Sequence, residues 1–280
     1  MKGKKMAGEK YQEEARVIAQ EELTGGVFSL YLHAGSIAAA AVPGQFVSVY
    51  CRDSSRLLPR PISLCEADPA DGTLRLVYRV AGKGTEEFSA LREGDALRIL
   101  GPLGNGFPLK RVVGKRVLLI GGGIGIPPLL YAAKKLCEPA GEDSGPSEVN
   151  AVLGYRSGQS RKDLFLAQAF AAVMGREPYA ATEDGRHGSR GTVLDCMREH
   201  ALSADVIFAC GPTPMLRALK AYALERKTEC YLSLEERMAC GVGACLACVC
   251  HSTGKDAHFN VNRKRVCAEG PVFNAEDVIL

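Results

Sequence analysis

Four cysteines near the C-terminus have a spacing that can hold a redox-active metal cluster. Three of them form a C-x4-C-x2-C loop, and the fourth follows in the segment Arg-Val-Cys-Ala-Glu-Gly. These four residues are Cys240, Cys245, Cys248 and Cys267. This is the ligand spacing of plant-type [2Fe–2S] proteins, whose clusters carry one electron at a time. Gly241 and Gly243 would let the loop wrap closely around inorganic sulfide and direct backbone N–H groups at it.

Zinc binding and buried structural thiols are the alternative readings of these cysteines. Zinc loops usually contain two separate C-x2-C pairs, whereas this loop contains one, so the cluster is favoured. The chain has 11 cysteines, and those outside the cluster spacing show no paired framework, which favours a reducing cytoplasm. They are Cys51, Cys65, Cys137, Cys196, Cys210, Cys230 and Cys250. We interpret Cys250 as a bystander, because Cys267 already completes the spacing.

The composition limits the classes of protein to which this chain can belong. At 280 residues with 46% hydrophobic residues, the chain can build two or three cored domains. A net charge of +3 and the lack of Trp argue against nucleic-acid binding. Apolar runs are too short for a membrane span, and the lysines before Met6 lead into polar sequence rather than a signal peptide. We therefore expect a cytoplasmic protein with a solvated N-terminus.

Residues 11–110 predict an antiparallel β-barrel. Polar and apolar residues alternate over 28–33, 45–50 and 73–80, with Gly and Pro between these runs. A helix is expected over 84–92 with Thr85 as its N-cap, and a loop over 101–108 closes the region.

Residues 111–226 predict an open parallel α/β sheet, and 227–280 a small cluster domain. Apolar strands are expected at 116–120, 149–155, 178–182 and 205–210, and helices at 129–136, 164–173, 192–200 and 214–225. An exposed turn is expected over 138–146. The fold class is therefore multi-domain, with a β-barrel, an α/β domain and a [2Fe–2S] domain.

A glycine-rich turn follows the first strand of the α/β region. Its glycines allow backbone to approach a diphosphate, and the next helix offers unpaired N–H groups. The turn glycines are Gly121, Gly122, Gly123 and Gly125. The sequence is not a strict G-x-G-x-x-G, so a simple tight turn is the alternative. Cys210 and Gly211 end another buried strand, where ligands of open α/β sheets bind, although a Pro-enforced helix entry would look similar.

Three motifs in the barrel could bind a flavin. In the first, Arg60 suits a phosphate and Ser63 a flavin hydrogen bond, with Pro61 and Ile62 between them. The second supplies a ring and a cation, and the third a helix N-terminus. These two motifs are Val77, Tyr78 and Arg79, and then Gly84 and Thr85. Read singly, each fits an ordinary strand or turn equally well.

Taken together and in this order, the motifs resemble the electron-transfer subunits of class 1B dihydroorotate dehydrogenases. These belong to the ferredoxin-reductase-like flavoproteins. The resemblance runs from about Val17 to Phe273, and its sharpest parts are 234–248 and 267–273. It implies FAD on the barrel motifs, NAD on the α/β domain, and a [2Fe–2S] cluster on the four cysteines. The implied partner is an FMN-containing subunit that oxidises dihydroorotate, in a heterotetramer with two copies of each chain.

The resemblance implies an electron path from partner FMN through the cluster and FAD to NAD+. A flavin must stand between the other two groups, because it handles both single electrons and hydride. No side chain is expected to act as acid or base, and Cys210 is expected to touch the nicotinamide–flavin stack rather than act as a nucleophile. Arg156, Ser157 and Arg161 could accept a 2′-phosphate, so NADP stays open beside NAD. The segment between Cys248 and Cys267 is long and polar for the family.

Two other functions remain open. One is an NAD(P)H:ferredoxin or sulfur-acceptor reductase subunit that also carries FAD and a [2Fe–2S] cluster. The other is a non-enzymatic redox sensor or iron–sulfur scaffold, which tight FAD binding and NADH-driven flavin bleaching would exclude.

Overall fold

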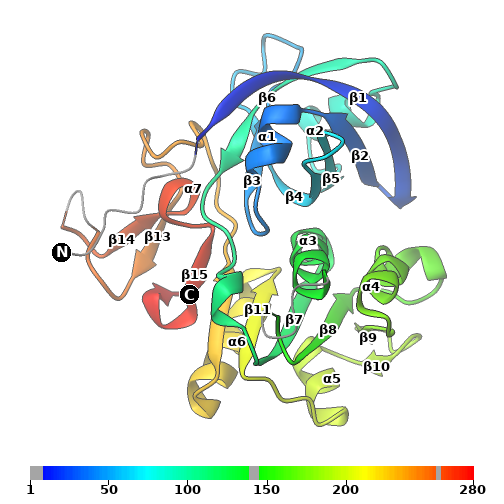
Figure 1. Ribbon diagram of the computed structural model, residues 1–280, viewed down its shortest axis with the longest axis vertical. Coiled ribbons are helices and arrows are strands. Elements are labelled where there is room, and N and C mark those ends of the chain that lie inside the picture. The colour runs from blue at the N-terminus through cyan, green and yellow to red at the C-terminus, as the bar shows by residue number, and fades with distance from the viewer. Residues whose placement is uncertain (1–8, 139–144, 257–259) are drawn as a thin grey trace.

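The computed structural model describes residues 9–138, 145–256 and 260–280. Figure 1 shows three parts: a barrel, an α/β sheet beneath it, and a small C-terminal region that flanks both. The three N-terminal lysines and most of the turn expected at 138–146 lie outside the described residues.

The first part is a closed barrel with strand order β1-β2-β5-β4-β3-β6. Its strands are β1 (Tyr11–Thr24), β2 (Val27–His33), β3 (Phe46–Val49), β4 (Arg60–Asp68), β5 (Thr73–Arg79) and β6 (Ala96–Leu103). Two short helices accompany them, α1 (Gly35–Ala40) and α2 (Lys83–Ser89). Alternation buries one face of most of these strands, so that Leu30, Leu74 and Leu97 are each about 1% exposed in the barrel core, whereas all four residues of β3 are buried.

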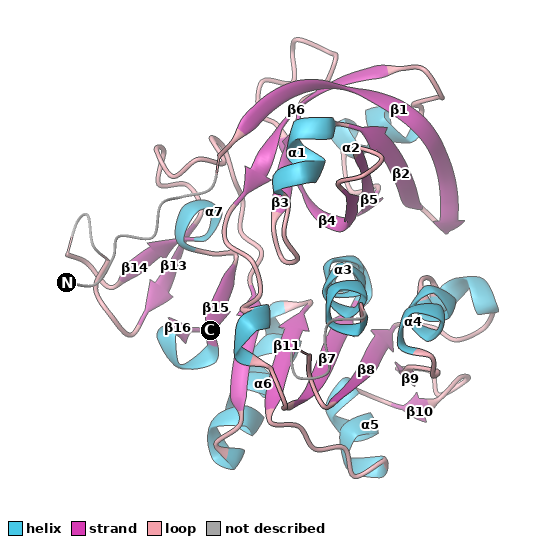
Figure 2. Ribbon diagram, viewed as in Figure 1, coloured by secondary structure: helices cyan, strands magenta, loops and turns pink. Residues whose placement is uncertain are grey.

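The second part is a sheet of order β10-β9-β8-β7-β11-β12-β15, parallel except for β15. Its strands are β7 (Arg116–Gly122), β8 (Glu148–Tyr155), β9 (Tyr179–Thr182), β10 (Ser189–Arg190), β11 (Val206–Cys210), β12 (Glu229–Ser233) and β15 (Val272–Asn274). Its helices are α3 (Ile126–Cys137), α4 (Ala167–Met174), α5 (Val193–Glu199) and α6 (Thr213–Arg226). Figure 2 shows α3 and α4 on the face toward the barrel and α5 and α6 on the other, which explains the continuous apolar strands.

The C-terminal region joins the sheet and adds a smaller one. Strands β12 and β15 continue the large sheet, while β13 (Val249–Ser252), β14 (Arg263–Arg265) and β16 (Val278–Ile279) form a three-stranded sheet. Helix α7 (Val266–Glu269) carries Cys267, and short 3-10 turns lie at Leu109–Arg111, Gly123–Gly125, Arg161–Leu164 and Ala275–Asp277. The sequence division at 226 therefore falls within the chain that builds one sheet.

Specific contacts fix the three parts against one another. Helix α3 packs on the barrel, where the buried Tyr131 hydroxyl donates to the Ala41 carbonyl at 3.0 Å. The Asn105 side chain, from the loop after β6, donates to the Val272 carbonyl at 2.8 Å and accepts from the Val272 N–H at 2.9 Å. The barrel is therefore held to both the α/β sheet and the cluster region.

Two local expectations were wrong. Thr85 is not the N-cap of α2: the cap is Gly82, and the Thr85 hydroxyl accepts from the N–H groups of Ala81 and Gly82. The helix expected over 164–173 is a 3-10 turn followed by α4, because Leu166 adopts a left-handed φ of 67° between them.

Candidate functional site

The cysteine loop directs a set of backbone N–H groups at one sulfur. Cys240 Sγ accepts from the N–H groups of Val242, Ala244 and Cys245 at 3.5, 3.3 and 3.4 Å. Burial opposes ionisation, yet these bonds lower the pKa of the Cys240 thiol to about 7. Gly243 has a φ of +86°, and a Cβ there would lie 2.9 Å from Ala268 Cβ. The loop is thus shaped to stabilise a thiolate.

The second pair of sulfurs lies on the buried side of the loop. The Cys267 thiol hydrogen-bonds Cys248, which with backbone N–H groups lowers the pKa of Cys248 to about 6 and raises that of Cys267. The Cys267 N–H also donates to Cys248 Sγ at 3.4 Å. Cys248 and Cys267 are buried, whereas Cys245 is exposed.

The four thiols therefore approach one another in two pairs, Cys240 with Cys245 and Cys248 with Cys267. Within the described ranges, no three His, Cys, Asp or Glu side chains converge on a point that could hold one metal ion. A [2Fe–2S] cluster needs no such point, because each iron takes two protein ligands and shares two sulfides. The donor set, four cysteine sulfurs in two close pairs, fits such a cluster.

A cavity of about 310 Å³ lies where the three parts of the molecule meet. Six of the predicted flavin residues line it, from β4 and β5: Pro61, Ile62, Ser63, Val77, Tyr78 and Arg79. The opposite wall includes Ile124 of the glycine turn and, from the segment leading to the cysteine loop, Ser233, Glu235 and Met238. Its size suits a flat ring system rather than a whole dinucleotide.

The remaining barrel residues lie outside this cavity. Arg60 rests against Gly84 in the first turn of α2, where a Cβ would come within 2.4 Å of Arg60 Nε. This close approach places a guanidinium beside helix N–H groups, an arrangement that suits phosphate. Tyr78 differs from expectation: its ring is 2% exposed and its hydroxyl donates to Gln20, so it cannot stack on a ring in the cavity.

The glycine turn and the Cys210 turn lie side by side at the carboxyl ends of β7 and β11. Cys210 pairs with Gly121 in the sheet register, and a Cβ on Gly211 would lie 3.1 Å from the Gly122 nitrogen. Strand order runs outward in both directions from this pair, which makes it the topological switch point where open α/β sheets bind ligands. Gly123 has a φ of +53° and open space around it.

Burial disfavours the reactive thiolate form of Cys210. Its thiol is 1% exposed, and burial raises its pKa to about 12. It hydrogen-bonds Ser233, which lines the cavity. Sequence reasoning missed the neighbouring Glu235, whose side chain is exposed and lines the cavity, and whose carboxyl pKa is raised by desolvation from the protein around it.

The loop after β8 contains an acidic partner that the sequence did not reveal. The Ser157 hydroxyl donates to Asp184 at 3.0 Å, and the Gly158 N–H donates to the same carboxylate at 3.2 Å. Hydrogen bonds, first from the Arg186 N–H, lower the pKa of the exposed Asp184 carboxyl. A negative charge therefore stands among the residues that were candidates for a 2′-phosphate.

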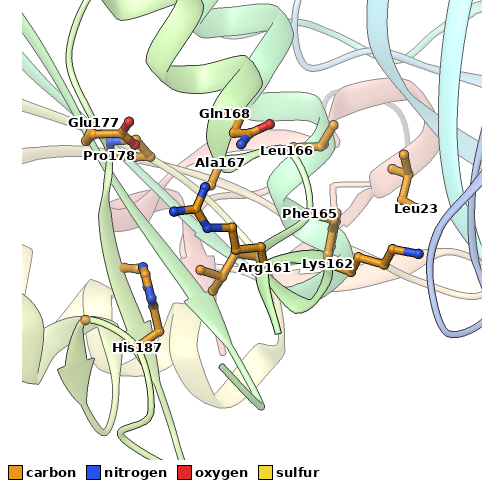
Figure 3. Close-up of a pocket in the computed structure, with 13 residues that line it drawn as sticks. Leu23, Arg161, Lys162, Phe165, Leu166, Ala167, Gln168, Glu177, Pro178 and His187 are labelled. Atoms are coloured by element: carbon orange, nitrogen blue, oxygen red, sulfur yellow. The ribbon is translucent and has the colours of Figure 1, made fainter. Parts of the chain in front are cut away.

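A second cavity of about 640 Å³ lies farther out, between α4 and β9. Figure 3 shows Arg161 reaching across it, with Leu23 and Lys162 at one end and Glu177 and His187 at the other. None of the predicted flavin, glycine-turn or cluster residues lines it. It is thus separate from the cavity beside the cysteine loop.

Within the residues that the structure describes, no helix is long and apolar enough to cross a bilayer.

Known proteins similar to this chain indicate its family. Residues 235–279 match the family model for the iron–sulfur cluster binding domain of dihydroorotate dehydrogenase B. The chain is 43% identical over 271 residues to the dihydroorotate dehydrogenase B (NAD(+)) electron transfer subunit of Bacillus caldolyticus, covering 96% of this chain and 99% of that one. The subunit of the same name from Listeria monocytogenes is 44% identical with the same coverage.

Solved structures agree with the fold. An NADH-dependent reduced ferredoxin-NADP oxidoreductase, studied for flavin-based electron bifurcation, superposes with a TM-score of 0.81 at 29% identity, covering 100% of this chain and 91% of that one. A ferredoxin NADP+ reductase from Neisseria gonorrhoeae shares the fold alone, at 16% identity and a TM-score of 0.62 over 76% of this chain and 91% of that one. The predicted family and fold class are both confirmed. The chain belongs to the family of dihydroorotate dehydrogenase B electron transfer subunits.

Proposed function

We propose that this chain passes electrons from a dihydroorotate-oxidising partner, through a [2Fe–2S] cluster and FAD, to NAD+. It is an oxidoreductase subunit that works with another chain in pyrimidine biosynthesis. The observation that carries this proposal is the 310 Å³ cavity, because its walls include the flavin motifs, the glycine turn and the approach to the cysteine loop. One flat ring bound there would contact all three regions.

The residues fit the three groups. The four cysteines would hold the cluster, which supplies single-electron transfer. Arg60, Gly84 and Thr85 would hold the diphosphate side of FAD. Residues 61–63 and 77–79 would line its ring, without the Tyr78 side chain stacking on it, and this ring supplies the exchange between single electrons and hydride. The glycines of 121–125, with Cys210 and Gly211, would bring the nicotinamide of NAD against that ring.

The unequal burial of the cysteines indicates the direction in which electrons would pass through the site. Cys245 is exposed and so marks the side that a donor protein can approach. Met238, just before Cys240, lines the flavin cavity, and Phe46, which lines the same cavity, belongs to the hydrophobic core cluster that also contains Cys248 and Cys267. Electrons would therefore enter beside Cys245 and leave beside Met238 and Phe46.

Proton balance gives Glu235 a role, which revises the expectation that no side chain acts as an acid or base. Electrons that arrive through a cluster bring no protons, whereas a nicotinamide accepts a hydride. One proton must therefore enter the cavity for each pair of electrons. Glu235 lines the cavity and its pKa is raised by burial, so its carboxyl oxygen can hold a proton nearer to neutral pH than an ordinary glutamate.

The charge near the loop after β8 supports NAD over NADP. The carboxylate of Asp184 accepts a hydrogen bond from Ser157, one of the residues that could accept a 2′-phosphate, and another from the neighbouring Gly158 N–H. An ionised carboxylate repels a phosphate and suits ribose hydroxyls.

The family name implies a catalytic partner. We propose that this partner is the FMN-containing dihydroorotate dehydrogenase subunit, in a heterotetramer with two of each chain, in the cytoplasm. The free state of every cysteine supports a reducing compartment. The limits 11–110, 111–226 and 227–280 stay our proposal for the functional domains.

Co-purification with the partner tests this function. The complex should reduce NAD+ when given dihydroorotate, and should reduce NADP+ far more slowly. Cys245→Ser should abolish this reaction while sparing NADH oxidation by small acceptors, and Cys250→Ser is the matched control that should retain both. Ferredoxin reduction that does not depend on dihydroorotate would instead favour a ferredoxin reductase. The TM-score of 0.81 to the NADH-dependent reduced ferredoxin-NADP oxidoreductase supports this second candidate.

A further inference from the structure

Arg265 links the cysteine loop to the element that carries Cys267. It ends β14, and its side chain is 14% exposed. Its Nη1 donates to the Gly243 carbonyl oxygen at 3.0 Å. Its Nε and its backbone N–H both donate to one Glu269 oxygen, at 3.1 and 2.8 Å. The guanidinium is therefore held in place by a carboxylate while it binds the loop.

The carbonyl that Arg265 binds belongs to the peptide group that joins Gly243 and Ala244. The same peptide group carries the Ala244 N–H, which donates to Cys240 Sγ at 3.3 Å. A positive charge on the oxygen of a peptide polarises its N–H, and hydrogen bonds in a chain strengthen one another. The charge of Arg265 is thus transmitted through one peptide to a sulfur of the cysteine loop.

We propose that Arg265 is a positioning residue that tunes the reduction potential of the cluster through the Gly243–Ala244 peptide, and that Glu269 moderates its effect. Hydrogen bonds to cluster sulfurs and the charge around them set the potential of iron–sulfur centres. A stronger bond to Cys240 favours the reduced, more negative cluster. Glu269 partly offsets the guanidinium and so acts in the opposite direction.

The inference rests on the cluster site of the proposed function. Three variants of the complete, cluster-loaded chain separate charge tuning from simple loosening. Arg265→Gln removes the positive charge, Glu269→Gln removes the negative one, and Arg263→Gln removes an exposed charge from the same strand. The readouts are the midpoint potential, from EPR-monitored titration, and the Fe–S(Cys) stretching bands, from resonance Raman spectra.

Arg265→Gln should make the equilibrium constant for cluster reduction about tenfold smaller, a shift of about −59 mV for one electron. Glu269→Gln should make that constant larger by a few-fold, and Arg263→Gln should leave it unchanged. The Raman bands should shift in opposite directions in the first two variants.

Shifts of the potential in the same direction for both variants, or unchanged potentials, would overturn the inference, because both changes loosen the same contact. If Arg265→Gln fails to hold a cluster, Glu269→Gln decides alone: a raised potential supports the inference, and an unchanged or lowered one defeats it. Wild-type protein without iron and sulfide would defeat the proposed function instead, so the two failures are distinguishable.

Discussion

Gly125→Ala tests whether the glycine turn is shaped by packing against the Cys210 strand. Gly125 has an ordinary φ of −80°, so alanine adds no backbone strain. Its Cβ, however, would lie 2.4 Å from the Cys210 carbonyl oxygen and 2.5 Å from the Gly211 nitrogen. Ordinary contact begins at 3.4 Å, so backbone at the end of β11 must move by about 1 Å.

This displacement has two expected consequences. Overpacking should lower the free energy of unfolding by about 1–3 kcal/mol, measured by thermal or denaturant unfolding. A 1 Å misplacement at the nicotinamide wall should slow NADH-driven flavin bleaching, followed by anaerobic stopped flow, by about 100-fold. FAD and iron content should not change. Gly145→Ala, in open space in the same domain, should match wild type in both assays.

The reasoning would be refuted if Gly125→Ala bleached its flavin at the wild-type rate with unchanged stability. Loss of FAD or of the cluster, with NADH reactivity retained, would also refute it. Either result would mean that the two turns do not build the nicotinamide site together.

Arg60→Ala should weaken FAD binding to the apoprotein by about 10-fold to 100-fold in a fluorescence titration, because a charge-assisted phosphate contact is lost; an unchanged Kd would place the diphosphate elsewhere. The raised pKa of Glu235 means that wild type gains stability from its protonated form at low pH and loses that stability as pH rises through the folded pKa. Glu235→Gln should therefore melt higher than wild type above that pKa and equally at low pH, and a difference at low pH would contradict the assignment. Asp184→Ser should narrow the preference for NAD+ over NADP+ in kcat/KM, and an unchanged ratio would remove this residue from nucleotide selection.

Features that depend on the spacing of neighbouring residues could be predicted from the sequence. The C-x4-C-x2-C loop and the glycine turn each come from a few adjacent residues whose geometry is set locally. Alternation also predicted the barrel, because one face of each strand must be buried. Tyr78 shows the limit, since its neighbours Val77 and Arg79 point away from it and its ring packs into the barrel core between Phe28 and Phe88.

Features that depend on distant segments could not be predicted. Asn105 hydrogen-bonds Val272, and Asp184 accepts a hydrogen bond from Ser157 in the loop after β8. No periodic pattern in the sequence indicates either contact. Arg265 looks like one more cation in a basic run until its bond to Gly243 is seen. Glu235 likewise gains its role from the cavity around it, which three separate regions of the chain create.

Anaerobic titration with NADH, followed by absorbance and EPR in one experiment, tests the central claim most directly. If one ring in the central cavity joins the nucleotide to the cysteine loop, the flavin should bleach and the EPR signal of a reduced [2Fe–2S] cluster should appear in the wild-type chain. A flavin that bleaches while no cluster signal develops, in protein that contains iron and acid-labile sulfide, would contradict the account.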